Sequence, residues 1–265
     1  MQNASHFYHD LALLDWHIEL GADEAIGETP INRYALAPPA PKPEAKPAAK
    51  PAPAPLAVVT TAAAPDVFDS TPLAQACKNL EALQIALEGF AHCPLKQGAR
   101  TTVFSDGNPA ARVMIVGEAP GKEEDFEGKP FICRAGKLLD KMFAAIGLSR
   151  HEDHPESALY ITNLLPWRPP QNRDPSPEEI ALMKPFLLRH IELAQPDFIV
   201  TMGNPSTKAL RDTTLGINKM RGQWGAVLGI PSIPLFHPAY LLRSPELKRL
   251  AWEDLLSLKA RLEGK

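Results

Sequence analysis

One stretch of the sequence concentrates carboxylates directly after an apolar run. The run VMIV (113–116) is followed by GEAPGKEEDFE, in which residues 118–127 include five Asp or Glu side chains. Carboxylates placed in this way can coordinate a divalent metal, or they can position a water beside a developing positive charge. A phosphate-binding loop is excluded, because only three residues separate Gly117 from Gly121 and Lys122 is followed by Glu. An acidic loop that only faces solvent is the alternative interpretation.

Asn163 and His237 are polar residues that also follow apolar runs. Asn163 comes directly after LYIT (159–162), and His237 comes two residues after SIPL (232–235). An Asn side chain can both accept from and donate to a planar amide, although an Asn in this position often only satisfies a turn. His237 is followed by PAYLLR, which is interpreted as a loop that supplies large apolar groups and a cation. Insertion into a base stack beside a phosphate would use such groups.

These side chains need a scaffold that brings them together. Four short apolar runs predict strands at 113–116, 159–162, 198–202 and 232–235. Helices are predicted at 71–88, 136–146 and 176–193, and also after 204–205 and 244–245, where Pro follows a capping residue. Alternating strands and helices predict an α/β fold with a central four-stranded parallel sheet and helices on both faces. Ligands bind at the carboxyl ends of such strands, so the acidic loop, Asn163 and His237 are expected on one rim, whereas Gly203–Pro205 is interpreted as structural.

The N-terminal quarter of the chain differs from this body in composition. Eight prolines fall in residues 37–55 among Ala and Lys, which predicts a semi-rigid spacer rather than a packed core. We therefore predict a helical head (1–36), a Pro/Ala-rich linker (37–70) and a globular domain (71–265). The head contains one amphipathic pattern, at about 5–26, and we expect this N-terminal helix to dock on the domain. A helix that binds a protein partner is the alternative.

Charge, hydropathy and cysteine content exclude several classes of protein. No run of 18 apolar residues predicts a membrane span, and the N-terminus lacks the basic start of a signal peptide, so we expect a cytoplasmic protein. The three cysteines include no C-x-x-C pair, so neither a disulfide framework nor a four-thiolate metal site is expected. Residues 78–265 carry 24 Lys and Arg against 22 Asp and Glu. This balance permits a polyanionic partner without requiring one.

Five motifs, in this order and at these distances, resemble those of the family 4 uracil-DNA glycosylases: GEAPGKEED with GKPF, YITN, RPPQNR, RGQW and HPAYLLR. The resemblance covers about Leu80 to Leu256 and leaves out the head and the linker. It implies a DNA repair enzyme that flips deoxyuridine out of DNA and hydrolyses its N-glycosidic bond, which releases uracil and leaves an abasic site. It also implies single- or double-stranded uracil-containing DNA as the partner, with no membrane, a monomeric protein and a nucleoid-associated location.

The resemblance assigns four residues to the base. Phe131 would stack on the flipped ring. Asn163 would accept from uracil N3–H and donate to O4, which cytosine cannot match. Gly117 and Glu118 would line the pocket near C5, where Glu118 helps to exclude the methyl group of thymine and is counted with the catalytic residues.

The resemblance also assigns residues to the bond that breaks and to the DNA. His237 would hydrogen-bond O2 and stabilise the departing anion. Glu124 would position or deprotonate the attacking water, with Asp125 as the less favoured candidate. Leu241 and Leu242 would fill the gap in the base stack, and the DNA contacts would also include Tyr240, Arg243 and Arg173.

One departure concerns a cofactor. The family usually binds a [4Fe–4S] cluster through four cysteines, and the corresponding positions here are Phe90, Cys93, Trp167 and Met183. One thiolate cannot replace the four that such a cluster needs. We therefore expect no iron–sulfur cluster, no other metal and no cofactor, with apolar packing in place of the cluster.

Two other functions stay open. A protein with this fold could recognise uracil-containing or damaged DNA without cutting it, and the loss of the cluster favours this alternative. Retention of Glu118, Glu124, Asn163 and His237 favours the enzyme. A metal-dependent nucleotide hydrolase that uses the acidic loop is the other alternative, and a chelator would abolish its activity.

Overall fold

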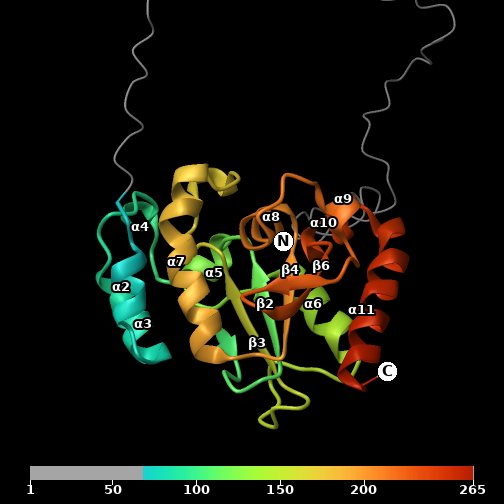
Figure 1. Ribbon diagram of the computed structural model, residues 1–265. Helices are drawn as coiled ribbons and strands as arrows, with labels where there is room; N and C mark the ends of the chain where they lie inside the picture. The colour runs from blue at the N-terminus through green and yellow to red at the C-terminus, as the bar shows by residue number, and fades with distance from the viewer. Residues whose placement is uncertain (1–67, 265) are drawn as a thin grey trace, which may run out of the picture. The chain divides into compact units, whose positions relative to one another are not determined.

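The computed structural model describes residues 68–264, so the predicted head and nearly all of the predicted linker lie outside the described residues. A sheet forms the centre of the described region (Figure 1). Its strands are β1 (Asp106–Gly107), β2 (Val113–Gly117), β3 (Leu159–Asn163), β4 (Phe198–Met202), β5 (Gly225–Val227) and β6 (Ile230–Leu235). They lie in the order β1-β3-β2-β4-β6-β5.

The four central strands, β3, β2, β4 and β6, are parallel, which confirms the predicted α/β fold with its four-stranded parallel sheet. Two short antiparallel strands extend the sheet at its edges, β1 beside β3 and β5 beside β6. The sequence analysis missed both of them. A strand of two or three residues carries no alternating pattern, because its register is set only by the neighbouring strand.

Helices cover both faces of the sheet (Figure 1). Their bounds are α2 (Thr71–Ala76), α3 (Leu80–Gly89), α4 (Leu95–Gly98), α5 (Lys122–Glu127), α6 (Arg134–Ala144), α7 (Pro177–Ala194), α8 (Asn204–Arg211), α9 (Ile217–Met220), α10 (Pro238–Arg243) and α11 (Lys248–Leu262), with 3-10 turns at Pro170–Asn172 and Pro245–Leu247. Side chains alternate along β2: Met114 and Val116 pack into the core beneath α3 and α7, while Val113 and Ile115 pack into the core beneath α6 and α11. Residues 68–264 contain no helix with the length and apolar character needed to cross a membrane.

Two predicted elements are corrected by the structure. The helix expected at 71–88 is two helices, because Asn79 adopts an extended conformation and its side chain accepts from the backbone N–H of Ala82 to begin α3. The segment after His237 forms α10 rather than a loop, with Pro238 at its first position. The predicted start of α7 is confirmed: Ser176 Oγ accepts from Glu179 N–H, and the Glu179 carboxylate accepts from Ser176 N–H.

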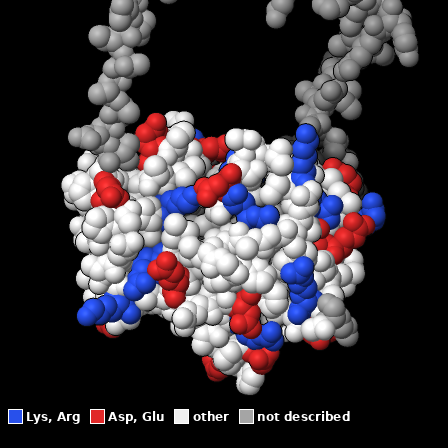
Figure 2. All heavy atoms as spheres, viewed as in Figure 1, with Lys and Arg blue, Asp and Glu red and all other residues white. Residues whose placement is uncertain are grey.

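Charged side chains are mixed on the face shown in Figure 2. Lys and Arg are interspersed with Asp and Glu, and neutral residues cover most of this face. Local arrangement rather than net charge must therefore select a polyanionic partner on this side of the molecule.

Candidate active site

A pocket of about 720 Å³ opens at the carboxyl ends of the parallel strands, and we call it the carboxyl-edge pocket. Loops that follow β2, β3, β4 and β6 supply its walls. Eight of the predicted site residues line it together: Glu118, Glu124, Phe131, Asn163, Arg173, His237, Tyr240 and Arg243. The topology therefore brings together side chains that are more than a hundred positions apart in the chain.

Asn163 lines this pocket, and Gly117 lies next to it at the end of the neighbouring strand. They are register partners at the ends of β2 and β3, and the Asn163 side chain is buried. A Cβ atom on Gly117 would overlap both Asn163 Oδ1 and the Phe131 ring. Glycine is therefore required at this position, because any side chain would displace the amide or the aromatic ring from the pocket.

Phe131 lies in the pocket wall with a backbone conformation that is rare for its residue type. Its φ is +53°, in the left-handed region. Its ring centroid lies 5.3 Å from that of His237, with an angle of 28° between the rings. A Cβ atom on Gly136 would overlap the Phe131 carbonyl, so this glycine leaves room for the turn. The aromatic face is thus placed beside the histidine before any ligand binds.

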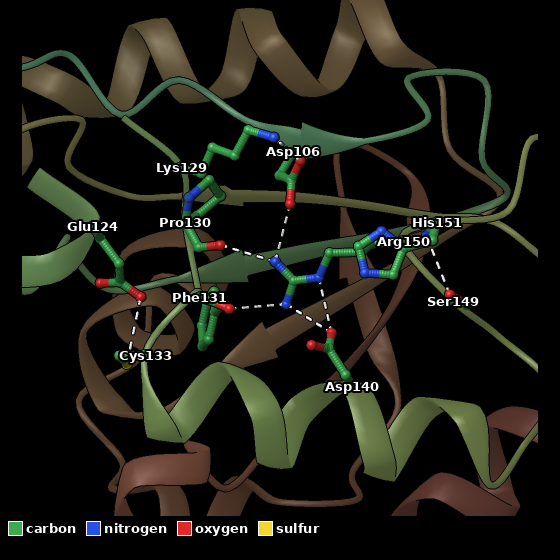
Figure 3. Close-up of polar contacts among 10 residues, drawn as sticks. All are labelled: Asp106, Glu124, Lys129, Pro130, Phe131, Cys133, Asp140, Ser149, Arg150 and His151. Atoms are coloured by element: carbon green, nitrogen blue, oxygen red, sulfur yellow. Dashed lines mark hydrogen bonds and ion pairs between the residues drawn. The ribbon is translucent and has the colours of Figure 1, made fainter. Parts of the chain in front are cut away.

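Glu124 is the buried carboxylate of the pocket (Figure 3). One of its oxygens accepts from the backbone N–H of Gly121 at 2.6 Å, and the other accepts from the Cys133 thiol at 3.8 Å. Burial raises the pKa of Glu124, and the backbone hydrogen bond from Gly121 opposes that rise. A carboxylate with a raised pKa is a stronger base for a water proton.

Asp125 is equally buried but points elsewhere. Its Oδ1 accepts from the backbone N–H groups of Arg100 at 2.9 Å and Thr101 at 3.3 Å. It does not line the pocket. Of the two neighbouring carboxylates, the geometry therefore favours Glu124 for chemistry, and Asp125 fixes the loop that precedes β1.

Glu118 differs from Glu124 in lying partly exposed in the pocket wall. Burial and, to a smaller extent, the negative charge of Asp174 together raise its pKa to about 7. The Glu118 carboxyl is therefore near its point of half-protonation at neutral pH. Its backbone carbonyl accepts from Leu165 N–H at 3.0 Å, which ties the acidic loop to the segment after β3.

His237 begins α10, and its ring opens on the pocket. Its Nδ1 accepts from the backbone N–H of Ala239 at 3.2 Å, so the proton of the neutral ring lies on Nε2. Burial and, to a smaller extent, the positive charge of Arg243 together lower the pKa of His237 to about 4. Gly203 packs against the His237 side chain, since a Cβ atom on Gly203 would lie 3.3 Å from His237 Cβ. The geometry therefore presents a neutral N–H donor at pH 7.

The structure corrects one predicted DNA contact. Leu241 is 1% exposed and packs with Ile217, Phe236 and Ala251, so it cannot enter a base stack. A helical turn places Leu241 on the face of α10 that points into the core. Leu242 is partly exposed, and Arg243 is exposed. These two residues and Tyr240 stay candidates for contact with DNA.

Arg173 forms an ion pair with Glu179. Its guanidinium donates to both carboxylate oxygens of Glu179, at 2.6 and 2.9 Å. This anchors the loop after Trp167, in which Gln171 and Asn172 both have positive φ. Half of the Arg173 side chain still faces solvent beside the pocket.

Sequence reasoning missed part of the pocket wall. Gly203, Asn204 and Pro205 line the pocket, although they were interpreted as structural. They follow the parallel strand β4 directly, so the rule that sends ligands to strand carboxyl ends would have included them. Gly203 is also the residue against which His237 packs.

A second buried region contains the four residues at the expected cluster positions, and we call Phe90, Cys93, Trp167 and Met183 the apolar plug. All four are at most 2% exposed and belong to one core cluster. Phe90 contacts Phe186 edge to face at 5.1 Å, and Trp167 Nε1 donates to Thr102 Oγ1 at 3.1 Å. Within residues 68–264, no group of three or more His, Cys, Asp or Glu could hold a metal ion. The side chains present do not fit an iron–sulfur cluster.

Comparison with known proteins identifies the family of this chain. The family model described as "Uracil DNA glycosylase superfamily" matches residues 104–256. The type-4 uracil-DNA glycosylase of Saccharolobus solfataricus is 38% identical over 71% of this chain and 88% of its own length. That of Thermotoga maritima is 41% identical over 63% of this chain and 86% of its own. With the predicted motifs gathered around one pocket, the chain belongs to the uracil-DNA glycosylase superfamily, among relatives of type 4.

Proposed function

We propose that this chain excises uracil from DNA by hydrolysing the N-glycosidic bond of a flipped deoxyuridine. The observation that carries the proposal is the meeting of Phe131, Asn163, His237 and Glu124 in one pocket of a superfamily member. The relatives named above are uracil-DNA glycosylases by description. Each of the four side chains has the chemistry that one step of base excision needs.

Recognition of the base rests on Asn163 and Phe131. The buried Asn163 amide can accept from uracil N3–H and donate to O4, while the face of Phe131 stacks on the ring. Cytosine offers an acceptor and a donor in the opposite order. Each buried polar group left unpaired by that mismatch costs about 1–3 kcal/mol, which supports discrimination between the two bases.

Exclusion of thymine rests on the wall near the base C5. Gly117 lets β2 approach Asn163 and Phe131 so closely that no side chain fits between them. Glu118 continues this wall directly after the strand. A C5 methyl group would have to occupy space that the loop backbone and the Glu118 side chain fill.

Bond cleavage rests on His237 and Glu124. When the C1′–N1 bond breaks, its electron pair goes to the base, and negative charge develops on O2. The neutral His237 ring, with its proton on Nε2, can donate to that oxygen. Glu124 orients a water toward C1′ and accepts its proton as the water adds to the cationic sugar. This scheme needs no metal.

Contact with DNA is proposed for the rim of the pocket. Tyr240 and Arg243 line the opening, and Leu242 lies between them on α10. Leu242 is the side chain left to fill the gap in the base stack, since Leu241 is in the core. We propose that a monomer acts, because one chain supplies every group that the chemistry uses. A partner for the head stays a prediction, because residues 1–67 lie outside the described part of the chain. A nucleoid location also stays a prediction.

We also propose that the protein works without an iron–sulfur cluster. The apolar plug supports this, because only Cys93 carries a thiol and burial raises the pKa of that thiol. A thiolate is the form that binds iron. Stoichiometric iron and absorbance in the visible in protein purified without air would contradict the proposal. Protein that lacks both and still excises uracil would support it.

The proposed reaction is tested on oligonucleotides that contain a single uracil. The purified chain is incubated with single- and double-stranded substrates in the presence of EDTA, and alkali-labile abasic sites are scored. We expect excision of uracil in EDTA and none from matched oligonucleotides with thymine or cytosine. Binding to the uracil oligonucleotide without excision would indicate a non-catalytic binder. Activity that EDTA abolishes would indicate a metal-dependent hydrolase.

A further inference from the structure

Arg150 is a buried arginine that lies outside the pocket and bonds to the chain that carries Phe131 (Figure 3). It precedes β3, and only 4% of its side chain is exposed. Its guanidinium donates to the carbonyl oxygens of Pro130 at 2.9 Å and Phe131 at 3.0 Å. No side-chain atom of Arg150 lines the carboxyl-edge pocket.

The two carbonyls belong to the peptide groups on either side of the Phe131 Cα, so Arg150 acts on the backbone at the strained position. A left-handed φ is unfavourable for a bulky residue unless the surroundings hold it. Hydrogen bonds from a charged donor are stronger than neutral ones, and two of them converge on this turn. Gly136 leaves the Phe131 carbonyl the space that any Cβ would fill. The turn is thus held by Arg150 and accommodated by Gly136.

Two carboxylates orient the guanidinium. Arg150 Nε donates to Asp140 on α6 at 2.8 Å, and one terminal nitrogen donates to Asp106 on β1 at 3.1 Å. Asp106 also lies 3.8 Å from Lys129, which precedes the turn. A buried arginine is tolerated because its charge is paired and its donors are used. This gives β1 a role, since the edge strand supplies one of the two carboxylates.

We propose that Arg150 is a positioning residue for base recognition: through the Pro130 and Phe131 carbonyls it holds the Phe131 ring in the geometry that stacks on the flipped uracil. The inference rests on the proposed function of the pocket. Arg150 touches neither the base nor the sugar. Its effect on excision therefore passes through Phe131, and it disappears when the Phe131 ring is removed.

A purely structural role would give a different result. If Arg150 only tied α6 to β1, its loss would lower stability and activity to the same extent whether or not residue 131 carried a ring. A mutant cycle separates the two cases. The proteins are wild type, Arg150→Met, Phe131→Ala and the double variant, each measured for kcat and KM on a uracil oligonucleotide and for thermal unfolding.

We expect Arg150→Met to lower kcat/KM roughly tenfold in the wild-type background, mainly through KM. A base stacked on an aromatic ring contributes about 1–3 kcal/mol, which corresponds to roughly 5- to 150-fold. In the Phe131→Ala background the same substitution should change kcat/KM less than about twofold. An equal loss in both backgrounds would overturn the inference.

Arg112 offers a matched control. It also pairs with two carboxylates, Glu156 at 2.5 Å and Asp197 at 2.6 Å, but it lies beside the amino ends of β2 and β4. Arg112→Met should leave kcat/KM unchanged while it lowers the melting temperature. A loss of activity in this variant as large as that in Arg150→Met would mean that destabilisation alone explains both, and it would overturn the inference.

A milder variant keeps the test valid if Arg150→Met does not fold. Arg150→Lys keeps the charge but cannot reach two carbonyls and two carboxylates at once. It should show the same dependence on Phe131, with a smaller loss. Binding of the uracil oligonucleotide, measured by fluorescence anisotropy, gives the same cycle without catalysis. Wild-type protein that binds but does not excise would contradict the proposed function, whereas additive losses in binding would contradict the role of Arg150.

Discussion

Two histidines of residues 68–264 have different surroundings: His190 is buried in the core, whereas His237 is partly buried and lines the carboxyl-edge pocket. His190 belongs to α7, stacks on Phe104 at 4.4 Å, and has its Nε2 2.8 Å from the Tyr160 hydroxyl. His237 opens on the carboxyl-edge pocket, and the hydrogen bonds of residues 68–264 give its Nε2 no partner. Burial lowers both pKa values, to about 3 for His190 and about 4 for His237. A perturbed pKa therefore does not separate a working histidine from a packed one.

Neighbouring carboxylates repeat this difference. Glu124 and Asp125 are both buried, but their side chains differ in direction. Asp125 accepts hydrogen bonds from backbone N–H groups of the loop at 100–101, whereas Glu124 faces the pocket. What separates the members of each pair is direction. His237 and Glu124 line the pocket, whereas the hydrogen bonds of His190 and Asp125 tie these two side chains to packed parts of the protein outside it. Matched substitutions at the two members of each pair test this distinction.

The largest effect is expected at the carboxylate pair. Glu124→Gln should lower kcat for uracil excision by about 10²–10⁴, because positioned acid–base groups contribute that much. Asp125→Asn should lower kcat less than about threefold and instead reduce stability by roughly 1–2 kcal/mol, since it weakens two hydrogen bonds to backbone N–H groups. Single-turnover excision and urea unfolding measure the two quantities. A catalytic loss in Asp125→Asn as large as that in Glu124→Gln would reverse our assignment.

The histidine pair should give the next largest effect. His237→Ala should lower kcat by about 10²–10³, the usual contribution of one donor to a developing anion. His190→Phe should keep kcat within about twofold but cost roughly 1–3 kcal/mol of unfolding free energy, because the bond to Tyr160 is lost in the core. Excision by His237→Ala at the wild-type rate would show that the donor lies elsewhere.

The pocket could be predicted largely from local sequence. Short apolar runs predicted the four parallel strands, and the rule for strand ends then placed Glu118, Asn163 and His237 on one rim. The roles of Phe131 and Glu124 were predicted from the family resemblance. The structure adds the left-handed turn at Phe131 and the contact of its ring with His237.

Other features could not be read from the sequence, for physical reasons. The contacts of Arg150 reach Asp106, 44 positions away, through an edge strand of two residues that has no pattern. Leu241 and Leu242 are adjacent apolar residues, so only the helical turn of α10 decides which one is buried. The break at Asn79 depends on a side chain that serves equally well in a turn or as a helix cap.

The smallest effect is expected at Glu118, whose raised pKa should make the free energy of unfolding depend on pH. Its folded-state pKa of about 7 lies above the ordinary value of 4.5, so the folded protein holds this proton more tightly than the unfolded chain does. The contribution of Glu118 to the free energy of unfolding is therefore fully present below about pH 4.5. It falls as pH rises toward 7, by about 1–2 kcal/mol once partial exposure to solvent is allowed for.

Glu118→Gln should remove this fall, so that wild type and variant differ most in stability above pH 7, where the variant is the more stable. Urea unfolding at pH 5, 6, 7 and 8 measures the difference, and Glu178→Gln, at an exposed position on α7, serves as the control. Parallel curves for wild type and Glu118→Gln would mean that the carboxylate is already ionised at pH 5. In that case Glu118 would carry its charge into the pocket at every working pH, and its part in excluding thymine would have to be electrostatic as well as steric.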